Sequence, residues 1–304
     1  MSGGTWGELR AVTESRLAAA GIASSDVEAR YLVEEASGLE GAELVVAARE
    51  QPTDHAARHL ESMTRRRAAG EPLQYVLGRW QFLGVDLLVD ARVLVPRPET
   101  EVLAQTAVEE VVRTGARRGR RDPWTGAVTS FAVADLGTGS GALALYLVGE
   151  LPDAEVWATD VSPDALAVAR ANFAGAGAPA TRVRAVEGSW FDALPEHLRG
   201  SLRLLVSNPP YVAAHEVAAL PREVADWEPM GALVSGATGL EALEHVVAHA
   251  PAWLDPEQGV LVTELAPHQA GPMRERAAAA GFTDVSVRQD LAGRDRVLVA
   301  RLAG

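Results

Sequence analysis

The chain has 304 residues, a length that suggests two domains or one large domain with an appendage. Hydrophobic residues make up 48% and charged residues 23%, as in globular proteins, and there is neither cysteine nor lysine. These missing residue types exclude a disulfide framework, a thiolate zinc site, a cysteine nucleophile and lysine Schiff-base chemistry. A formal charge of −13 disfavours a protein that slides along DNA, because such binding rests on neutralised phosphates.

The chain's first residues include no basic segment followed by an apolar run, so no signal peptide is expected. No stretch approaches the roughly 18 apolar residues that a membrane span needs. We therefore expect a cytoplasmic protein, and we expect a monomer.

Three parts follow one another along the chain. Residues 1–72 have the apolar spacing of helices and predict a small all-α domain. Residues 73–96 contain alternating apolar residues from Val85 to Val89 and an apolar run from Val93 to Val95, which together predict a β-hairpin linker. Residues 97–304 form the third and largest part.

Within this third part, residues 113–128 are rich in arginine and in turn-forming residues. We interpret them as a solvated surface loop that is dispensable for chemistry, with a contact to RNA or to the ribosome as the alternative.

From residue 129 onward, strand patterns alternate with helix patterns, which predicts an α/β fold with a mostly parallel sheet. The last two strands are separated only by a short loop around Leu291 to Arg294, too short for a crossover. The last strand should therefore be antiparallel. The predicted strands are residues 131–136, 155–160, 182–186, 202–207, 259–264, 282–287 and 296–302.

A glycine-rich turn follows the first predicted strand. Residues 135–142 read Asp-Leu-Gly-Thr-Gly-Ser-Gly-Ala and lead into a helix. Glycine lets the backbone turn sharply and approach a ligand closely, and the carboxyl edge of a parallel sheet is where ligands bind. The candidate ligand-binding residues of this turn are Gly137, Thr138, Gly139, Ser140 and Gly141.

Asp160 ends the second predicted strand, where a carboxylate can accept hydrogen bonds from both hydroxyls of a ribose. Its alternative role is to cap the helix that begins at Pro163, a role that Ser162 could equally fill. The turn and the acid together indicate an adenosine-type ligand, either NAD or S-adenosylmethionine (AdoMet).

The fourth predicted strand is followed by Asn208-Pro209-Pro210-Tyr211. Neither proline can donate a backbone hydrogen bond, so their carbonyls act only as acceptors on a stiff loop. With the side-chain oxygen of Asn208 and the ring of Tyr211, they form a clamp for a planar group that carries an –NH2. A dehydrogenase has no need of such a clamp, which favours AdoMet.

Two further features have alternative interpretations. Trp190, after the third strand, either flanks an adenine or packs in the core. His55 with His59, and His245 with His249, are spaced as on one helix face but lack the glutamate of a zinc motif, so no metal site is expected.

With these motifs taken together, the chain resembles the HemK/PrmC family, the N5-glutamine methyltransferases of peptide-chain release factors. Besides the glycine turn and the Asn-Pro-Pro-Tyr clamp, the resemblance rests on further segments: residues 72–78, 82–84 and 93–101, Glu228-Pro229, Ala232-Leu233, and residues 290–296. It covers nearly the whole chain. Asn-Pro-Pro-Tyr alone is shared with DNA adenine and some RNA guanine methyltransferases.

The resemblance implies a class I AdoMet-dependent methyltransferase domain with a seven-stranded sheet, preceded by a helical domain that helps to hold the protein substrate. It implies that AdoMet is bound by residues 137–141, Asp160, Trp190 and Asn208. It also implies that the glutamine of a Gly-Gly-Gln loop in class-1 release factors is bound by residues 208–211, with Asn208, Pro209 and Tyr211 catalytic.

Three departures from the family pattern are Ser189 in place of an acid, the absence of an acidic pair at residues 236–239, and Thr-Glu-Leu-Ala at 263–266. None removes a clamp residue, so an active enzyme is expected. The alternatives are a nucleic-acid amino-methyltransferase acting on adenine N6 or guanine N2, and a non-catalytic AdoMet-binding module. The net charge of −10 over residues 129–304 disfavours the first.

Overall fold

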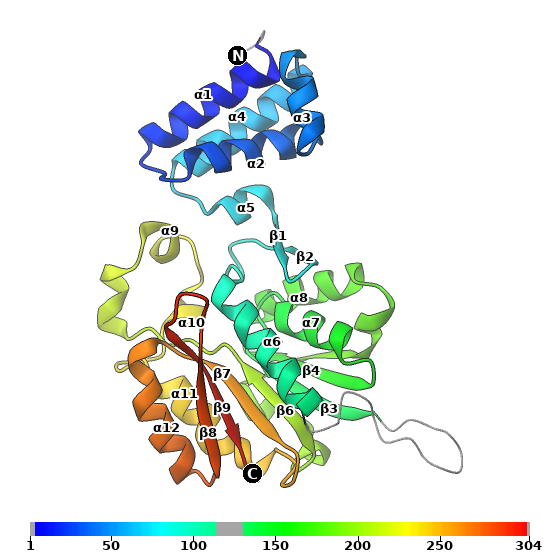
Figure 1. Ribbon diagram of the computed structural model, residues 1–304, viewed down its shortest axis with the longest axis vertical. Coiled ribbons are helices and arrows are strands. Elements are labelled where there is room, and N and C mark those ends of the chain that lie inside the picture. Colours follow the sequence, from blue (N-terminus) through cyan, green and yellow to red (C-terminus); the bar gives the residue numbers. More distant parts are fainter. Residues whose placement is uncertain (1–3, 114–129, 303–304) are drawn as a thin grey trace. The chain divides into compact units, whose positions relative to one another are not determined.

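The computed structural model describes residues 4–113 and 130–302 (Figure 1). The chain divides into two compact units. The first comprises Met1–Arg79 together with Pro221–Trp227, and the second comprises Trp80–Leu220 together with Glu228–Gly304. The three-part division at residues 72 and 96 remains a proposal. Most of the segment at 113–128 lies outside the described residues.

The first unit is helical. Thr5 begins α1 with a capping box that includes Glu8, and Thr53 accepts a hydrogen bond from the first turn of α4, so that backbone N–H groups at these helix starts are satisfied. The apolar side chains Leu17, Leu32 and Met63 are fully buried between the helices. The helices are α1 (Trp6–Ala19), α2 (Ser25–Ser37), α3 (Ala42–Val46), α4 (Asp54–Ala68), α5 (Leu73–Leu77) and α9 (Arg222–Ala225).

A buried arginine connects α9 to the other helices of this unit. Nε of Arg67 lies 2.5 Å from a carboxylate oxygen of Glu28, and its Nη2 lies 3.1 Å from one of Glu223. The side chain of Arg67 is only 7% exposed, so loss of either partner would leave a buried charge less well compensated. A segment distant in the sequence thus belongs to the helical unit through this ion pair.

The second unit begins at Trp80, within a hairpin made of β1 (Arg79–Phe82) and β2 (Val85–Leu88). Leu83 and Gly84 both have positive φ, as a two-residue hairpin turn requires. The hairpin is shorter than the sequence indicated. Residues 73–77 are helical, and Val93 and Val95, although buried, belong to no strand. Their apolar character serves packing rather than strand pairing.

The core of the second unit is a seven-stranded sheet in the order β5-β4-β3-β6-β7-β9-β8. The strands from β5 to β7 pair in parallel, and β9 pairs antiparallel with both β7 and β8. The prediction of an antiparallel last strand is therefore confirmed. The strands are β3 (Phe131–Leu136), β4 (Ala154–Asp160), β5 (Val183–Glu187), β6 (Leu202–Ser207), β7 (Val260–Glu264), β8 (Asp284–Gln289) and β9 (Asp295–Arg301).

Helices cover both faces of this sheet, and the alternation of strand side chains explains why (Figure 1). In β7, Val260 and Val262 join the core under α6, α7 and α8, whereas Leu261 between them joins the core under α11 and α12. The helices of this unit are α6 (Pro98–Arg113), α7 (Ala142–Glu150), α8 (Pro163–Gly175), α10 (Met230–Leu233), α11 (Glu241–His249) and α12 (Ala270–Ala279).

The strand order reverses on either side of β3, which pairs with β4 on one edge and with β6 on the other. Crossovers from such a pair of edges lead away in opposite directions and leave a crevice beyond the carboxyl ends of the strands. The glycine-rich turn, Asp160 and Asn208 follow the ends of β3, β4 and β6, and so belong to this crevice.

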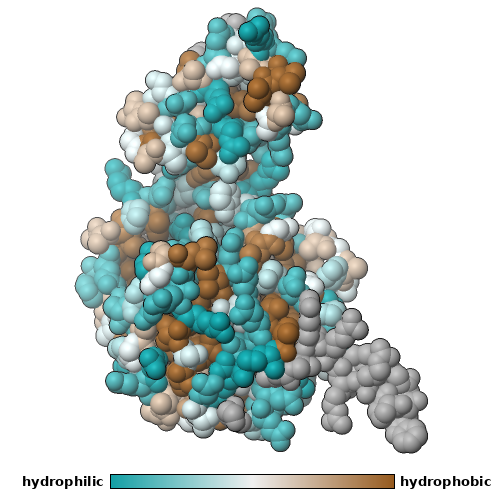
Figure 2. Space-filling view, viewed as in Figure 1, coloured by the Kyte–Doolittle hydropathy of each residue, from teal (hydrophilic) through white to brown (hydrophobic). Residues whose placement is uncertain are grey.

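Hydrophobic residues on the visible surface form separate patches among hydrophilic ones (Figure 2). Val45 and Val46 of α3 are the most exposed large hydrophobic residues of the helical unit among those described, at 72% and 80%. In the described part of the chain, every helix is too short or too polar to cross a membrane.

Candidate functional site

The glycine-rich turn connects β3 to α7. Gly137, Gly139 and Gly141 all have positive φ, which side chains other than glycine rarely adopt. The backbone N–H groups of Gly137 and Thr138 both donate to the carbonyl of Thr159 in the neighbouring strand. A Cβ atom built on Gly139 would have no neighbour within 4 Å, so the turn leaves open space for a ligand there.

Gly141 differs from the other two glycines because it packs against the protein. A Cβ atom at this position would lie 2.5 Å from Cε1 of Phe173 in α8. We expect Gly141→Ala to lower the free energy of unfolding by about 2–5 kcal/mol, since it combines a left-handed backbone with overpacking. Gly139→Ala is the matched control and should cost only about 1–2 kcal/mol, from the backbone alone. Urea unfolding measures both, and equal losses would contradict the packing role.

Asp160 holds the turn from the adjacent strand. Its Oδ2 accepts a hydrogen bond of 2.9 Å from the N–H of Gly139, and its Oδ1 accepts one of 2.9 Å from the N–H of Ser162. Burial raises the pKa of this carboxyl group, and the backbone donors oppose the rise. The cap of α8 is Ser162, whose hydroxyl accepts from the N–H of Ala165. The carboxylate of Asp160 is therefore not the helix cap, and each of its oxygens keeps a lone pair for a ligand.

A cavity of about 370 Å³ lies at the carboxyl ends of these strands. Several predicted binding residues line it, namely Gly137, Thr138, Gly139, Ser140, Asp160, Trp190, Asn208 and Pro210. Gly141, Pro209 and Tyr211 are absent from its lining. The cavity thus joins the glycine turn, the acid and part of the clamp, which lie far apart in the sequence.

The position of Trp190 is compatible with both of its alternative interpretations, and a contact with adenine remains a proposal. Its side chain packs against the core between the sheet and α11, and it also lines the cavity. Its backbone has a positive φ of 47°, unusual for an aromatic residue. Ser189, at the position where the family pattern has an acid, lines the cavity as well and is exposed.

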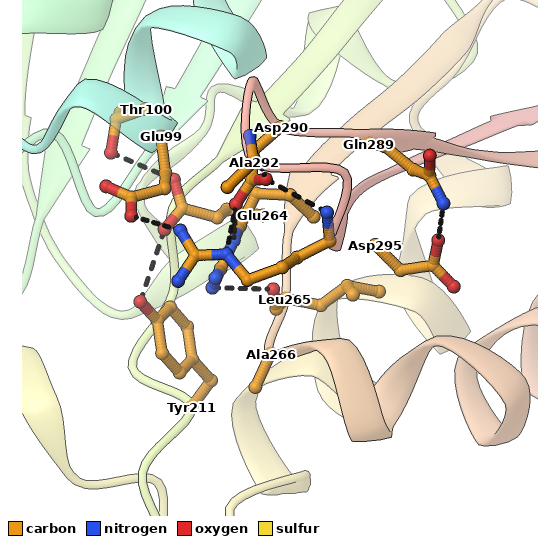
Figure 3. Close-up of polar contacts among 12 residues, drawn as sticks. Glu99, Thr100, Tyr211, Glu264, Leu265, Ala266, Gln289, Asp290, Ala292 and Asp295 are labelled. Atoms are coloured by element: carbon orange, nitrogen blue, oxygen red, sulfur yellow. Dashed lines mark hydrogen bonds and ion pairs between the residues drawn. The ribbon is translucent and has the colours of Figure 1, made fainter.

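The clamp is connected to a buried glutamate that the sequence had not marked as functional. Nδ2 of Asn208 donates to Oγ1 of Thr100 at 3.1 Å, and Oγ1 of Thr100 donates to Oε2 of Glu264 at 2.8 Å. The phenol of Tyr211 donates to the other carboxylate oxygen of Glu264 at 3.3 Å. Figure 3 shows Thr100 and Tyr211 converging on Glu264 from α6 and from the loop after β6.

Burial governs the protonation of two carboxyl groups near the site. It raises the pKa of Glu264 to about 7, although hydrogen bonds from Thr100 and Tyr211 and the charge of Arg296 act against it. It likewise raises the pKa of Asp135 to about 7, against the hydrogen bond that Thr138 donates to it. The sequence offered one signal for Glu264: it is a carboxyl group at the end of a mostly apolar strand, where burial is expected to perturb its pKa.

The predicted histidine pairs form no larger group. The rings of His245 and His249 lie 4.3 Å apart on α11 and pack beside Phe191. Within residues 4–113 and 130–302, no group of three or more histidine or acidic side chains is placed to hold a metal ion.

Comparisons with known proteins agree with this geometry. The family description "PrmC N-terminal domain" matches residues 8–78, and "Methyltransferase small domain" matches residues 126–224. A protein of Deinococcus radiodurans named release factor glutamine methyltransferase is 40% identical over 98% of this chain and 98% of its own length. A protein of Cereibacter sphaeroides with the same name is 40% identical over 94% of this chain and 95% of its own.

Solved structures share the fold at much lower identity. The catalytic domain of hMettl16 in complex with a MAT2A 3′UTR hairpin is 14% identical, with a TM-score of 0.55 and coverage of 83% of each chain. A methyltransferase from Pyrococcus furiosus is 19% identical, with a TM-score of 0.50 over 73% of this chain and 91% of that one.

The seven-stranded sheet with its antiparallel β9, and the glycine turn that begins α7, define a class I methyltransferase fold. The sequence prediction of this fold class is confirmed. Identity of 40% over nearly the whole length goes further, and the chain belongs to the release factor glutamine methyltransferase family. The family named from the sequence motifs is thus also confirmed.

Proposed function

We propose that this protein transfers a methyl group from AdoMet to the side-chain amide nitrogen, N5, of the glutamine in the Gly-Gly-Gln loop of class-1 release factors. The observation that carries the proposal is the placement of Asn208. Its Nδ2 is held by Thr100, its side chain lines the cavity beside the glycine turn, and within the described residues its Oδ1 takes part in no hydrogen bond. This arrangement supports the proposal because it leaves an acceptor oxygen available to a ligand in the cavity.

The cavity residues fit AdoMet. The space over Gly139 accommodates a ligand close to the backbone, and Asp160 keeps acceptor capacity for ribose hydroxyls. The ring of Trp190 supplies a flat apolar wall for adenine. When bound, AdoMet supplies a methyl group on a positively charged sulfur.

The protein must make a poor nucleophile react. An amide nitrogen is weakly nucleophilic because its lone pair is delocalised into the carbonyl group. A neutral amide N–H is also too weakly acidic for deprotonation to come first. Oδ1 of Asn208 and the carbonyl of Pro209 would therefore orient the amide and accept its N–H groups, and Tyr211 would confine its plane.

These acceptors would strengthen their hold as positive charge develops on the nitrogen, so they stabilise the transition state more than the bound substrate. After the transfer, the amide proton would pass to water. No residue of the site would need to act as an acid, since AdoMet supplies a leaving group that is neutral once it has lost the methyl group.

The net charge of the larger part of the chain argues against the alternative activity on nucleic acids. Residues 129–304 carry a net charge of −10, which repels the phosphate backbone. The fold alone does not separate the two activities, because the hMettl16 catalytic domain in complex with a MAT2A 3′UTR hairpin shares it.

Mass spectrometry of a release factor incubated with the protein and AdoMet tests the proposal directly. The expected result is a mass increase of one methyl group on the peptide that contains Gly-Gly-Gln. Parallel incubations with RNA and DNA should give no methylated adenine or guanine, and methylation of nucleic acid in place of the release factor would overturn the assignment.

A further inference from the structure

We propose that Thr100 and Glu264 are positioning residues that set the orientation of the Asn208 amide, so that its oxygen rather than its nitrogen faces the substrate. The inference rests on the proposed function, since it concerns how the clamp accepts an N–H group. It is carried by the direction of the hydrogen bonds that connect Asn208, Thr100 and Glu264.

The direction follows from what each group can donate. An ionised carboxylate only accepts hydrogen bonds, so the single hydrogen of the Thr100 hydroxyl must point to Oε2 of Glu264, 2.8 Å away. Oγ1 of Thr100 is then left with lone pairs only on the side of Asn208, 3.1 Å away. It can accept from the Asn208 –NH2 group but cannot donate to the Asn208 oxygen.

This constraint matters because an asparagine side chain has nearly the same shape in its two flipped orientations. With the amide flipped, Asn208 would present –NH2 to a substrate –NH2, and two donors would face each other. The orientation seen here instead presents an acceptor to the cavity. Thr100 therefore selects the orientation that fits an amide substrate, and Glu264 makes Thr100 selective.

The same carboxylate also holds Tyr211. Its Oε1 accepts from the phenol at 3.3 Å, while its Oε2 accepts from Thr100, so each oxygen of Glu264 serves one arm of the clamp (Figure 3). The side chain is fully buried at the end of β7 and cannot exchange these donors for water. A single buried group thus holds both functional side chains of the clamp.

Charged groups around Glu264 favour opposite protonation states. Arg296 on β9 stabilises the carboxylate, whereas Glu99 on α6 destabilises it. Glu99 is itself paired with Arg294 at 2.9 Å, and Asp290 lies 3.6 Å from Nε of Arg296. Tyr211 contributes a neutral donor. Burial outweighs these contributions and raises the pKa of Glu264 to about 7.

A proton on Glu264 would remove the directional constraint. The neutral carboxyl group can donate to Thr100, and the hydroxyl of Thr100 is then able to donate to the oxygen of Asn208. Activity should therefore be retained above about pH 7 and should fall as the pH is lowered through the pKa of Glu264.

The experiment compares Thr100→Val with Thr100→Ser in steady-state methylation of a release factor. Valine keeps the shape of threonine and removes the hydroxyl, whereas serine keeps the hydroxyl. We expect Thr100→Val to lower kcat about 10–100-fold with little change in KM, because orientation and not contact area is lost. Thr100→Ser should recover most of the loss.

Thr106→Val is the matched control, since Thr106 is a buried threonine on the same helix that has no part in this network. It should leave kcat unchanged. Calorimetric titration with AdoMet should give the same affinity for Thr100→Val as for the wild type, and release-factor binding should also be unchanged. Equal kcat in Thr100→Val and the wild type, or equal losses in the valine and serine variants, would overturn the inference.

Glu264→Gln provides a second, independent measurement if Thr100→Val does not fold. Glutamine offers one oxygen where Thr100 and Tyr211 need two, and it does not titrate. The acidic limb near pH 7 should disappear from the kcat profile of this variant, and its plateau should be lower. Persistence of that limb would contradict the role of Glu264. A wild-type protein that methylates no release factor would instead refute the proposed function itself.

Discussion

Replacing Asn208 with alanine is expected to slow methyl transfer by at least ~100-fold, the scale observed when one oriented transition-state contact is removed. Asn208 lines the cavity with its Nδ2 held by Thr100, and under the proposed function the contact of its Oδ1 with the substrate nitrogen would strengthen only as that nitrogen gains charge. AdoMet should still bind within a few-fold of wild-type affinity, because the glycine turn and Asp160 remain. Single-turnover methylation of purified release factor, alongside AdoMet titration, measures both quantities.

Variants of Tyr211 provide the comparison for the loss of activity expected in Asn208→Ala. Tyr211→Ala should lose less activity than Asn208→Ala, and Tyr211→Phe should recover part of that loss because the ring face confines the substrate plane. Recovery should be incomplete, since phenylalanine cannot donate to Glu264 as Tyr211 does at 3.3 Å. Wild-type turnover in Asn208→Ala would mean that the Asn-Pro-Pro-Tyr segment is only a structural turn, and its catalytic assignment would have to be withdrawn.

The sheet was predictable because its strands can be recognised from the local pattern of apolar residues in the sequence. Buried parallel strands read as short apolar runs, and β3, β6 and β7 all do so. The antiparallel direction of β9 followed from a loop too short for a crossover. The apolar run at Val93 to Val95 was wrongly predicted to be part of the hairpin. A buried loop has the same apolar composition as a buried strand, so the sequence could not separate the two.

The sequence could suggest candidate site residues only where local backbone geometry or ligand chemistry demands a particular residue type. The glycines of the turn and the Asn-Pro-Pro-Tyr segment can be recognised as candidate binding residues from the sequence, since few other residues can replace them. Thr100 and Glu264 are separated by 164 positions, and their hydrogen bond forms only when α6 and β7 pack together. No local pattern reveals which way Asn208 points, because that depends on this long-range pair.

Asp160→Ala should produce the largest loss of AdoMet affinity of any single change in the cavity, about 100-fold or more. Two hydrogen bonds from ribose hydroxyls to a charged acceptor are each worth roughly 1.5–3 kcal/mol. The carboxylate also accepts from the N–H of Gly139 at 2.9 Å, so its removal releases the turn that faces the ligand. Both effects act on cofactor binding, and neither requires the release factor.

Isothermal titration with AdoMet measures this loss without reference to turnover. Asp164→Ala is the control, because Asp164 is an exposed carboxylate in the first turn of α8 that does not line the cavity. It should bind AdoMet as the wild type does. Thermal unfolding should show both variants folded, since Ser162 and not Asp160 caps the helix. Unchanged affinity in folded Asp160→Ala would show that the carboxylate only supports the glycine turn, and the ribose would then have to be bound elsewhere in the cavity.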